Sequence, residues 1–477
     1  MRNFLFYDLE TSGLSKSFDQ ILQFAAVRCD AKLREIERYS FYVKLRPDII
    51  PSPLASITHR ISIEKTRKGL TEYDAVCKIH KLINTPGTIS IGYNTMGFDD
   101  EFLRFSFYRN LLTPYTHQFA NECVRMDLFP MAVMYSLYKR DVIKWPVIEE
   151  KTSLKLENLN KANDLAHGQA HDATVDVDIT IELARKFMQE KEMWKYLTRY
   201  FDKNEDLERT NQMPEVFQSE SGIHRLAIMS SGSFGNKNNF HAPVLLIGNS
   251  IPYKNQWIWL RLDFPELRNA TKDNISEHCY TIRKKLGEPE FLLPPKERFL
   301  EKIVPERKKE MDKNIKWLQN NPEIFKEISS HFRTYKYDNI PDLDIDTSLY
   351  QNGFMDDDER VICETFHKLR SEDKYKAVRS FKTNDNRELG HRIMHRNFKS
   401  LVPEDSHYNF EPYLAKINPK EGDKPLMDFK KHERMTPKAA LKEIDSIKQD
   451  GLLNLDSQQK YILAELENYI KDNFVPS

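Results

Sequence analysis

The amino-acid sequence predicts a multidomain protein that begins with a mixed α/β sheet domain. At 477 residues, the chain has material for roughly two to four domains with large hydrophobic cores. Apolar runs of strand length alternate with segments of helical spacing at first, and short strands follow a charged, turn-like segment. We therefore expect an α/β domain at residues 1–200, a β-containing middle domain with a helical insert at 201–346, and an all-helical domain at 347–477.

Five apolar runs predict the strands of the first domain. Residues 4–9 are almost wholly apolar, which is typical of a central buried strand. Residues 21–29 and 36–45 would form a meander with this strand, and residues 88–93 and 123–128 supply two more. Three strands precede the first long helix and the later strands alternate with helices, so the sheet should be mixed.

Apolar residues at helical spacing predict the helices of this domain. Residues 71–83 carry such a stripe, and Thr71 is a suitable N-cap. Further helices are expected at residues 99–109, after the fifth strand as far as residue 138, and at residues 173–188.

Composition excludes several classes of protein. Lys+Arg 72 equals Asp+Glu 72, so net charge points to no partner. Five well-separated cysteines without a CxxC pair argue against a disulfide framework or structural zinc and favour a reducing compartment. The N-terminus lacks a signal-peptide core, and no run of 18 apolar residues is present. The simplest interpretation is a soluble, cytoplasmic protein.

Two carboxylates end the first strand. Side chains alternate along a strand, so Asp8 and Glu10 project from the same face. Their charges repel each other and are costly to bury, and a divalent cation such as Mg²⁺ or Mn²⁺ removes both costs. The alternative is a strand that simply runs into the polar turn at residues 11–13.

Three further residues extend this acidic set. Asp99 opens a predicted helix, where the helix dipole alone could explain a carboxylate. His171 stands just before another helix, five residues ahead of Asp176, so the two side chains can converge. Asp178 lies about 200° around that helix from Asp176 and should be solvated. His171 alone could be a helix-start residue without chemistry, but together these residues predict one metal site for phosphodiester cleavage.

These motifs resemble the three exonuclease motifs of the DEDD superfamily, in its histidine-type branch. Asp8-Leu9-Glu10-Thr11, Asn94-x3-Phe98-Asp99 and His171-x4-Asp176 carry the resemblance. Longer stretches are similar to the bacterial exonuclease I family: residues 23–28, 91–94, 98–101, 107–110, 159–163, 231–235, 349–354 and 396–398.

The resemblance implies a ribonuclease-H-like exonuclease domain, an SH3-like middle domain and a helical C-terminal domain. It implies a hydrolase that degrades single-stranded DNA from the 3′ end to 5′-mononucleotides by two-metal hydrolysis, in DNA repair and recombination. Asp8, Glu10 and Asp176 would hold two Mg²⁺ ions, which Mn²⁺ can replace, and Asp99 would complete the set. His171 would deprotonate the attacking water as a general base.

The resemblance also implies contacts with the DNA strand. The candidate residues are Glu10, Thr11, Leu14, Lys155, Arg104, Tyr115 and Phe119. Lys155 stands where the family usually has arginine, so the charge is kept but the bidentate fork is lost. Aromatic rings suit single-stranded substrate because every base can stack, although Tyr115 and Phe119 could instead be core residues. Arg60 departs from a usual glycine, so its loop could differ.

Two basic features bear on partners. The family binds the acidic tail of single-stranded DNA-binding protein (SSB), and Lys139 and Arg140 lie in the matching neighbourhood. Residues 368–399 hold ten Lys or Arg and four Asp or Glu. This stretch is either a rim that draws DNA toward the site or a solvated helix face. A monomer is expected.

Two other functions remain open at this point. A 3′ exoribonuclease would use the same chemistry, and no residue clearly reads or excludes a 2′-hydroxyl. A non-catalytic scaffold that binds single-stranded DNA or SSB is the second alternative. The presence of all five motif residues argues against this scaffold.

Overall fold

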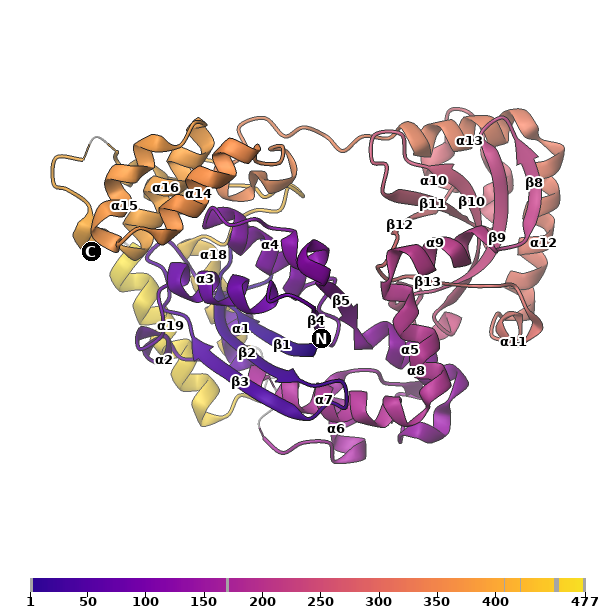
Figure 1. The fold of residues 1–477 in the computed structure, drawn as a ribbon, viewed down its shortest axis with the longest axis horizontal. Helices are drawn as coiled ribbons and strands as arrows, with labels where there is room; N and C mark the ends of the chain where they lie inside the picture. The colour runs from indigo at the N-terminus through magenta and orange to yellow at the C-terminus, as the bar shows by residue number, and fades with distance from the viewer. Residues whose placement is uncertain (1–2, 169–170, 407, 421, 450–453, 475–477) are drawn as a thin grey trace. The chain divides into compact units, whose positions relative to one another are not determined.

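The computed structural model describes residues 3–168, 171–406, 408–420, 422–449 and 454–474. The chain forms two compact units, each assembled from segments that are distant in sequence (Figure 1). The first unit contains residues 1–125, 166–181 and 339–477, and the second contains residues 126–165 and 182–338. These units cut across the three domains expected from the sequence, whose boundaries stay predictions.

A five-stranded mixed sheet forms the centre of the first unit. Its order is β3-β2-β1-β4-β5. The strands are β1 (Asn3–Thr11), β2 (Ile21–Cys29), β3 (Glu35–Tyr42), β4 (Thr88–Gly92) and β5 (Val124–Asp127). Strand β1 runs antiparallel to β2 and parallel to β4, and β2 runs antiparallel to β3. All five predicted strands are therefore confirmed, and the run with the two carboxylates is central.

Helices cover both faces of this sheet. On one face, α3 (Glu72–Ile83) and α4 (Asp99–Arg109) pack on apolar side chains of β1 and β2, including Leu5 and Leu9. On the other face lies α7 (Ala173–Gln189), whose Thr174 hydroxyl is 3.1 Å from that of Ser40 on β3. All five cysteines are thiols rather than members of disulfides.

Asp178 on α7 corrects one detail of the sequence analysis. It turns away from the acidic set as expected, but it is not simply solvated. Its carboxylate lies 2.9 Å from the guanidinium of Arg38 on β3, and its side chain is 37% exposed. The ion pair links α7 to the edge of the sheet.

The C-terminal part of the first unit is helical. Its helices are α14 (Asp357–Lys368), α15 (Ser371–Ala377), α16 (Asn384–Asn397), α17 (Glu411–Ile417), α18 (Pro437–Gln449) and α19 (Ser457–Phe474). Helices α14 and α16 share a core with α3 and α4, and α17 to α19 pack around α1 (Pro53–His59). Among the described residues, no helix is both long and apolar enough to cross a bilayer.

Arg60, the residue after α1, adopts a left-handed backbone conformation, which glycine adopts more readily than other residues. Its φ of 59° and ψ of 28° are left-handed, and its N–H donates to the carbonyl of Ser56. The guanidinium pairs with Asp456, just before α19. The next helix, α2 (Ile63–Arg67), is capped by Glu465 of α19, which accepts from two of its backbone N–H groups at 2.8 Å. Contacts with Asp456 and with Glu465 of α19 therefore hold this loop, and the effect of Arg60 on its shape stays a prediction.

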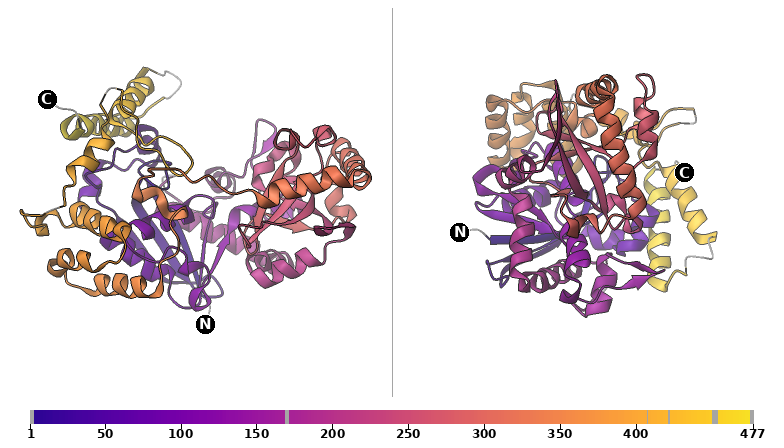
Figure 2. Two further views of the ribbon diagram at one scale, coloured as in Figure 1. Left: turned by 90° about the horizontal axis from the view of Figure 1, so that it is seen from above. Right: turned by 90° about the vertical axis from the view of Figure 1, so that its right-hand side faces the viewer.

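The second unit is built on an antiparallel sheet of order β12-β11-β10-β9-β13, with β8 paired to β9. Its strands are β8 (Glu215–Ser219), β9 (Gly222–Ser230), β10 (His241–Asn249), β11 (Gln256–Arg261), β12 (Thr281–Lys285) and β13 (Phe291–Leu293); β6 (Val147–Ile148) and β7 (Lys151–Thr152) form a separate hairpin. Its helices are α5 (Leu128–Tyr138), α6 (Leu156–Asn163), α8 (Lys191–Thr198), α9 (Lys203–Asn211), α10 (Ile275–His278), α11 (Glu297–Leu300), α12 (Pro305–Asn320) and α13 (Pro322–Thr334). Helices α12 and α13 lie along one face of the sheet (Figure 2). Trp259 is fully buried and packs in the core of this sheet.

A buried ionic network joins the sheet domain to the C-terminal helices within the first unit. Arg46 contacts Asp48 at 3.1 Å and Glu72 at 2.8 Å. Arg396 of α16 reaches Asp48 at 2.9 Å and also binds Asp346. All five side chains are at most 2% exposed. Removing any one of them would leave an uncompensated charge in the interior.

Arg396→Ala should lower the free energy of unfolding by about 3–5 kcal/mol, because it removes a buried cation that two buried carboxylates, Asp48 and Asp346, share. Urea unfolding followed by circular dichroism measures this loss. Arg370→Ala is the control, because its pair with Asp373 is exposed and should contribute at most about 1 kcal/mol. Equal effects of the two variants would show that the network does not support the fold.

Candidate active site

Three carboxylates converge where β1 meets α7. Asp8, Glu10 and Asp176 each offer an oxygen, and these oxygens lie within 4.8 Å of one another. All three side chains are half-buried. The first two leave β1 on the face opposite α3 and α4, and the third comes from the first turn of α7.

Local structure brings α7 to this position. Gln23 lies opposite Glu10 in the β1–β2 register, and its amide donates to the Asp172 carboxylate at 3.1 Å. The same oxygen of Asp172 accepts the Thr174 backbone N–H at 2.9 Å, as an N-cap does. Asp176 follows one turn later, and its N–H donates to the Asp172 carbonyl. The sequence analysis did not include Asp172 among the site residues, although an N-cap signal before α7 was available.

Asp99 adds charge to the site without joining the three-membered group. It is the first residue of α4 and is 6% exposed. Its carboxylate raises the pKa of both Asp8 and Glu10. The predicted metal role of Asp99 stays a prediction.

The carboxylates of β1 are held in an unfavourable environment. Burial raises the pKa of Asp8 well above its ordinary value, and the charges of Asp99 and Asp176 raise it further. The pKa of Glu10 is raised by burial and then by Asp176 and Asp99. Clustered carboxylate oxygens of this kind are the ligands that hard divalent cations prefer. The residues present therefore fit a divalent metal ion.

His171 is exposed and lies two residues before α7, with a left-handed φ of 61°. A second imidazole, that of His59, is close enough for the charge of His171 to lower its pKa. His59, at the end of α1, is 4% exposed, and burial followed by the charge of His171 lowers its pKa to about 4. The Nδ1 of His59 accepts the Ile61 N–H at 2.9 Å, so the neutral ring carries its proton on Nε2. The sequence analysis did not identify His59 as a neighbour of the site.

Asp100, in the first turn of α4, is held in place by three side chains. Its carboxylate accepts hydrogen bonds from Arg104, from Arg125 Nη1 at 2.5 Å and from His117 Nε2 at 2.7 Å. Burial raises the pKa of Asp100, but Arg125 and Arg104 outweigh burial and hold it well below its usual range. Arg104, expected to touch DNA, is thus 8% exposed and committed to Asp100. Its guanidinium also lies 5.7 Å from the ring centre of Tyr115.

The other expected DNA contacts differ widely in exposure. Leu14 is 73% exposed and Phe119 is 63% exposed, whereas the buried Thr11 hydroxyl donates to the Gly13 carbonyl at 2.8 Å. Phe119 is therefore not a core residue. Lys155 belongs to the second unit, and its ammonium lies 3.9 Å from Glu157.

Phe354 is an aromatic residue that the sequence analysis did not select. It is 87% exposed, and its ring contacts that of Tyr115 at 5.7 Å. It lies in residues 349–354, a stretch that resembles the exonuclease I family, and that resemblance was the signal that could have identified it.

Part of the basic stretch at residues 368–399 serves the interior. Lys374, Arg392 and Arg396 are at most 9% exposed. Lys374 donates to two carbonyls at the end of α14, and Arg392 pairs with Asp344 at 2.7 Å. Neither a DNA rim nor a solvated helix face describes these three residues.

The chain is similar to known exonucleases. A family model for exonucleases (RNase_T) matches residues 5–184, which contain all five motif residues. Exodeoxyribonuclease I of Escherichia coli is 31% identical over 382 residues, covering 75% of this chain and 78% of the relative. Exodeoxyribonuclease I of Buchnera aphidicola subsp. Schizaphis graminum is 38% identical over 207 residues, 43% of each chain. The chain belongs to the exodeoxyribonuclease I family, as its motifs predicted.

Solved structures share the fold. The crystal structure of E. coli exonuclease I in complex with a dA16 oligonucleotide has a TM-score of 0.82 at 22% identity, covering 99% of this chain and all of that chain. Exonuclease I from Methylocaldum szegediense gives a TM-score of 0.82 at 23% identity, with the same coverage. The predicted fold class is confirmed: a mixed-sheet exonuclease domain, a domain with an antiparallel sheet and a helical C-terminal region.

Asp8→Asn should stabilise the metal-free protein at neutral pH. A carboxyl whose pKa is raised by folding costs stability as the pH rises from its unfolded to its folded pKa, and the amide removes that cost. Thermal melts with EDTA should show a higher Tm for the variant. Divalent metal should stabilise the wild type by about 2.7 kcal/mol at about a hundred times its Kd, and should stabilise the variant much less.

The matched control for this experiment is Asp178→Asn, which removes a carboxylate from the same helix as Asp176 but outside the acidic group. It should leave the metal-induced shift intact. A full metal shift in Asp8→Asn would contradict the assignment of the metal site.

Proposed function

We propose that this protein removes nucleotides one at a time from the 3′ end of single-stranded DNA, and that it uses two Mg²⁺ ions. Membership in the exodeoxyribonuclease I family supports exodeoxyribonuclease activity and a divalent-metal requirement. The observation that carries the proposal is the group of three carboxylate oxygens within 4.8 Å of one another. A cluster of partly buried carboxylates that raise the pKa of Asp8 and Glu10 supports hydrolysis on this fold better than binding alone.

Residues of the first unit would have different roles in this reaction. Asp8, Glu10 and Asp176 would hold the metal, and Asp99 would add negative charge beside them. The bound metal would stabilise the attacking and leaving oxygens of the phosphodiester. His171 would take the proton of the attacking water, and its exposure lets it release that proton to solvent. Asp100 would keep α4, and thus Asp99, in place.

Exposed apolar side chains of the first unit would receive the strand. Leu14, Phe119 and Phe354 are more than 60% exposed. Tyr115 supports Phe354 from one side. Rings of this kind bind bases of any sequence by stacking, which suits an enzyme that must digest every sequence.

Digestion of 5′-labelled oligomers tests the proposal. A DNA ladder that shortens from the 3′ end, requires Mg²⁺ and is lost in Asp8→Ala is the expected result, whereas Asp178→Ala should remain active. A matched RNA oligomer should be cut more slowly. Preference for RNA would indicate an exoribonuclease, and binding without cleavage would indicate a scaffold.

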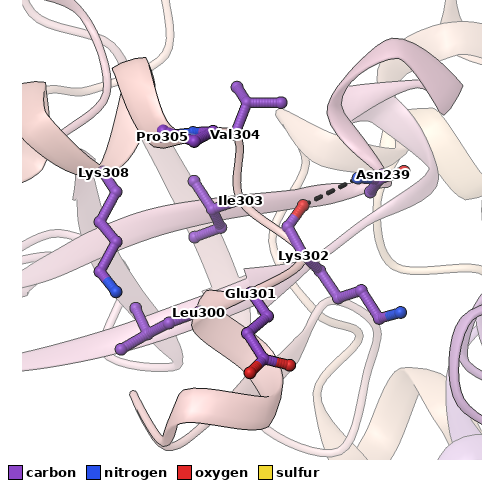
Figure 3. A pocket seen from close by; sticks show the side chains of 8 residues that line it. All are labelled: Asn239, Leu300, Glu301, Lys302, Ile303, Val304, Pro305 and Lys308. Atoms are coloured by element: carbon purple, nitrogen blue, oxygen red, sulfur yellow. Dashed lines mark hydrogen bonds between the residues drawn. The ribbon is translucent and has the colours of Figure 1, made fainter.

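We further propose that a pocket in the second unit takes the acidic tail of SSB. The pocket encloses about 400 Å³ and is lined by Asn239, Leu300, Glu301, Lys302, Ile303, Val304, Pro305 and Lys308 (Figure 3). Lys302 and Lys308 extend to opposite sides in this view, with apolar Leu300 and Ile303 between them. The Lys302 ammonium lies 5.6 Å from the ring centre of Tyr138. Paired cations around an apolar floor suit a tail that carries both carboxylates and an apolar side chain.

Lys139 and Arg140, expected near the SSB site, follow Tyr138 at the end of α5. Lys139 pairs with Glu190 at 2.7 Å, and Arg140 donates to the Ser136 carbonyl at 3.1 Å. Both interactions lie within the second unit. Lys302 is thus the cation that links this neighbourhood to the pocket. Action in the bacterial cytoplasm as a monomer stays part of the proposal.

Lys308→Glu should weaken binding of an acidic SSB-tail peptide by at least about tenfold, or about 1.4 kcal/mol, because it reverses one charge of the pocket. Fluorescence anisotropy with a labelled peptide measures this change. Lys309→Glu changes the exposed neighbouring residue outside the pocket lining and serves as the control. Equal affinities of the two variants would remove the pocket from consideration.

A further inference from the structure

A serine and a histidine are hydrogen-bonded beside the β8–β9 turn of the second unit. Ser219 is the last residue of β8, and its Oγ lies 2.7 Å from Nε2 of His224 on β9. His224 Nδ1 lies 2.8 Å from the carbonyl oxygen of Leu246 on β10. The three clustered carboxylates belong to the first unit, so this pair is separate from the candidate active site. We call Ser219 and His224 the serine–histidine pair.

The Leu246 carbonyl determines which nitrogen of His224 can act as a base. A carbonyl oxygen only accepts hydrogen bonds, so Nδ1 carries the proton and Nε2 offers its lone pair to the serine hydroxyl. The β9–β10 register runs from His241 to Leu245, and the imidazole binds the next carbonyl of β10. A hydroxyl bonded to a base whose other nitrogen is anchored is the arrangement that activates a serine nucleophile.

The imidazole is buried, whereas the serine is exposed. His224 is 1% exposed, and its ring centre lies 4.6 Å from that of Phe325 and 4.9 Å from that of Phe217. Burial lowers the pKa of His224 below its ordinary value, and the hydrogen bond to the β10 carbonyl offsets this only in part. The ring is therefore neutral at neutral pH and free to take a proton. Ser219 itself is open to solvent.

The turn between β8 and β9 orients the serine hydroxyl. The Ser221 N–H donates to Ser219 Oγ at 3.1 Å, and the Ser221 hydroxyl lies 2.8 Å from the same oxygen. With these groups on its other side, Ser219 directs its own proton to Nε2 of His224. Gly222, the next residue, has a φ of 123°, and no atom of the described residues lies within 4 Å of where its Cβ would be. A small molecule can therefore approach the turn from solvent.

We propose that Ser219 is a nucleophile that accepts an acyl group from small activated esters, with His224 as its general base. His224 Nε2 takes the hydroxyl proton as Oγ bonds to the ester carbonyl carbon. The ester C–O bond then breaks, and the proton passes from Nε2 to the leaving oxygen, so the products are acyl-Ser219 and an alcohol or phenol. Activated esters suit the pair because their leaving group departs with little assistance. The reaction uses no residue of the first unit, so it is independent of the proposed function.

Acylation of the full-length protein by p-nitrophenyl acetate tests this inference. Release of p-nitrophenol gives the rate, and peptide mapping by mass spectrometry locates the acetyl group. Ser219→Ala should abolish acetylation of this turn, and His224→Gln should slow acetylation of Ser219 by at least about a hundredfold. Because Ser219 is exposed, Ser219→Ala should keep the melting temperature of the wild type and digest DNA at the wild-type rate.

Ser276→Ala is the matched control. Ser276 is also exposed in the second unit, and its Oγ lies 2.9 Å from Nε2 of His331. Among the residues that the structure describes, none forms a hydrogen bond with Nδ1 of His331, so this ring lacks the anchor that His224 has. Ser276→Ala should therefore leave both the rate and the position of acetylation unchanged.

The position of the acetyl group decides the outcome. An acetyl group on Ser219 that forms slowly in His224→Gln and normally in Ser276→Ala supports the proposal. Acetyl groups confined to lysine side chains, or an unchanged rate in folded Ser219→Ala, would overturn it. Equal acetylation of Ser219 and Ser276 in the wild type would also overturn it, because the anchored imidazole would then have no effect.

Discussion

The buried pairing of Arg46 and Arg396 with acids from both ends of the chain is the constraint on which the first unit depends. Asp48 accepts from both arginines, so the sheet domain and α16 share one charge-balanced centre. Such a centre fixes relative position because its members cannot separate without exposing a charge to an apolar interior. Helices α17 to α19 then pack on α1, and Glu465 caps α2.

In the acidic site of the same unit, neighbouring charges shift the pKa of buried carboxyl groups in the opposite direction. Around Asp48 and Asp100, arginines compensate the buried carboxylates and lower their pKa. Around Asp8 and Glu10, further carboxylates raise the pKa instead. The fold therefore stores unfavourable charge at one place, and a divalent cation relieves it. The balanced ion pairs elsewhere in the unit stabilise the fold and so offset this local cost in folding free energy.

Sequence patterns predicted the secondary structure well, but they did not predict which partner each side chain would contact. The ranges of β2 and α4 match the expectation residue for residue, because apolar periodicity reports burial directly. The predicted DNA contact of Arg104 stays a prediction, and the sequence did not predict that Asp100, one turn away, would accept from its guanidinium. Arg60 was expected to allow a different loop, and the sequence did not predict that its guanidinium would pair with Asp456. Such partners lie far apart in sequence or compete locally, so a pattern cannot rank them.

The sequence by itself determined the class of this protein: alternation placed Asp8 and Glu10 on one face, and the resemblance of the three motifs indicated an exonuclease. Only the tertiary structure decided which side chains meet. It brought Asp176 to β1 through Gln23 and Asp172, and it placed Phe354 against Tyr115. The physical reason is the distance along the chain over which each kind of interaction acts. Periodicity and capping act over a few residues, whereas these contacts join segments more than a hundred residues apart, whose meeting depends on the packing of the whole unit.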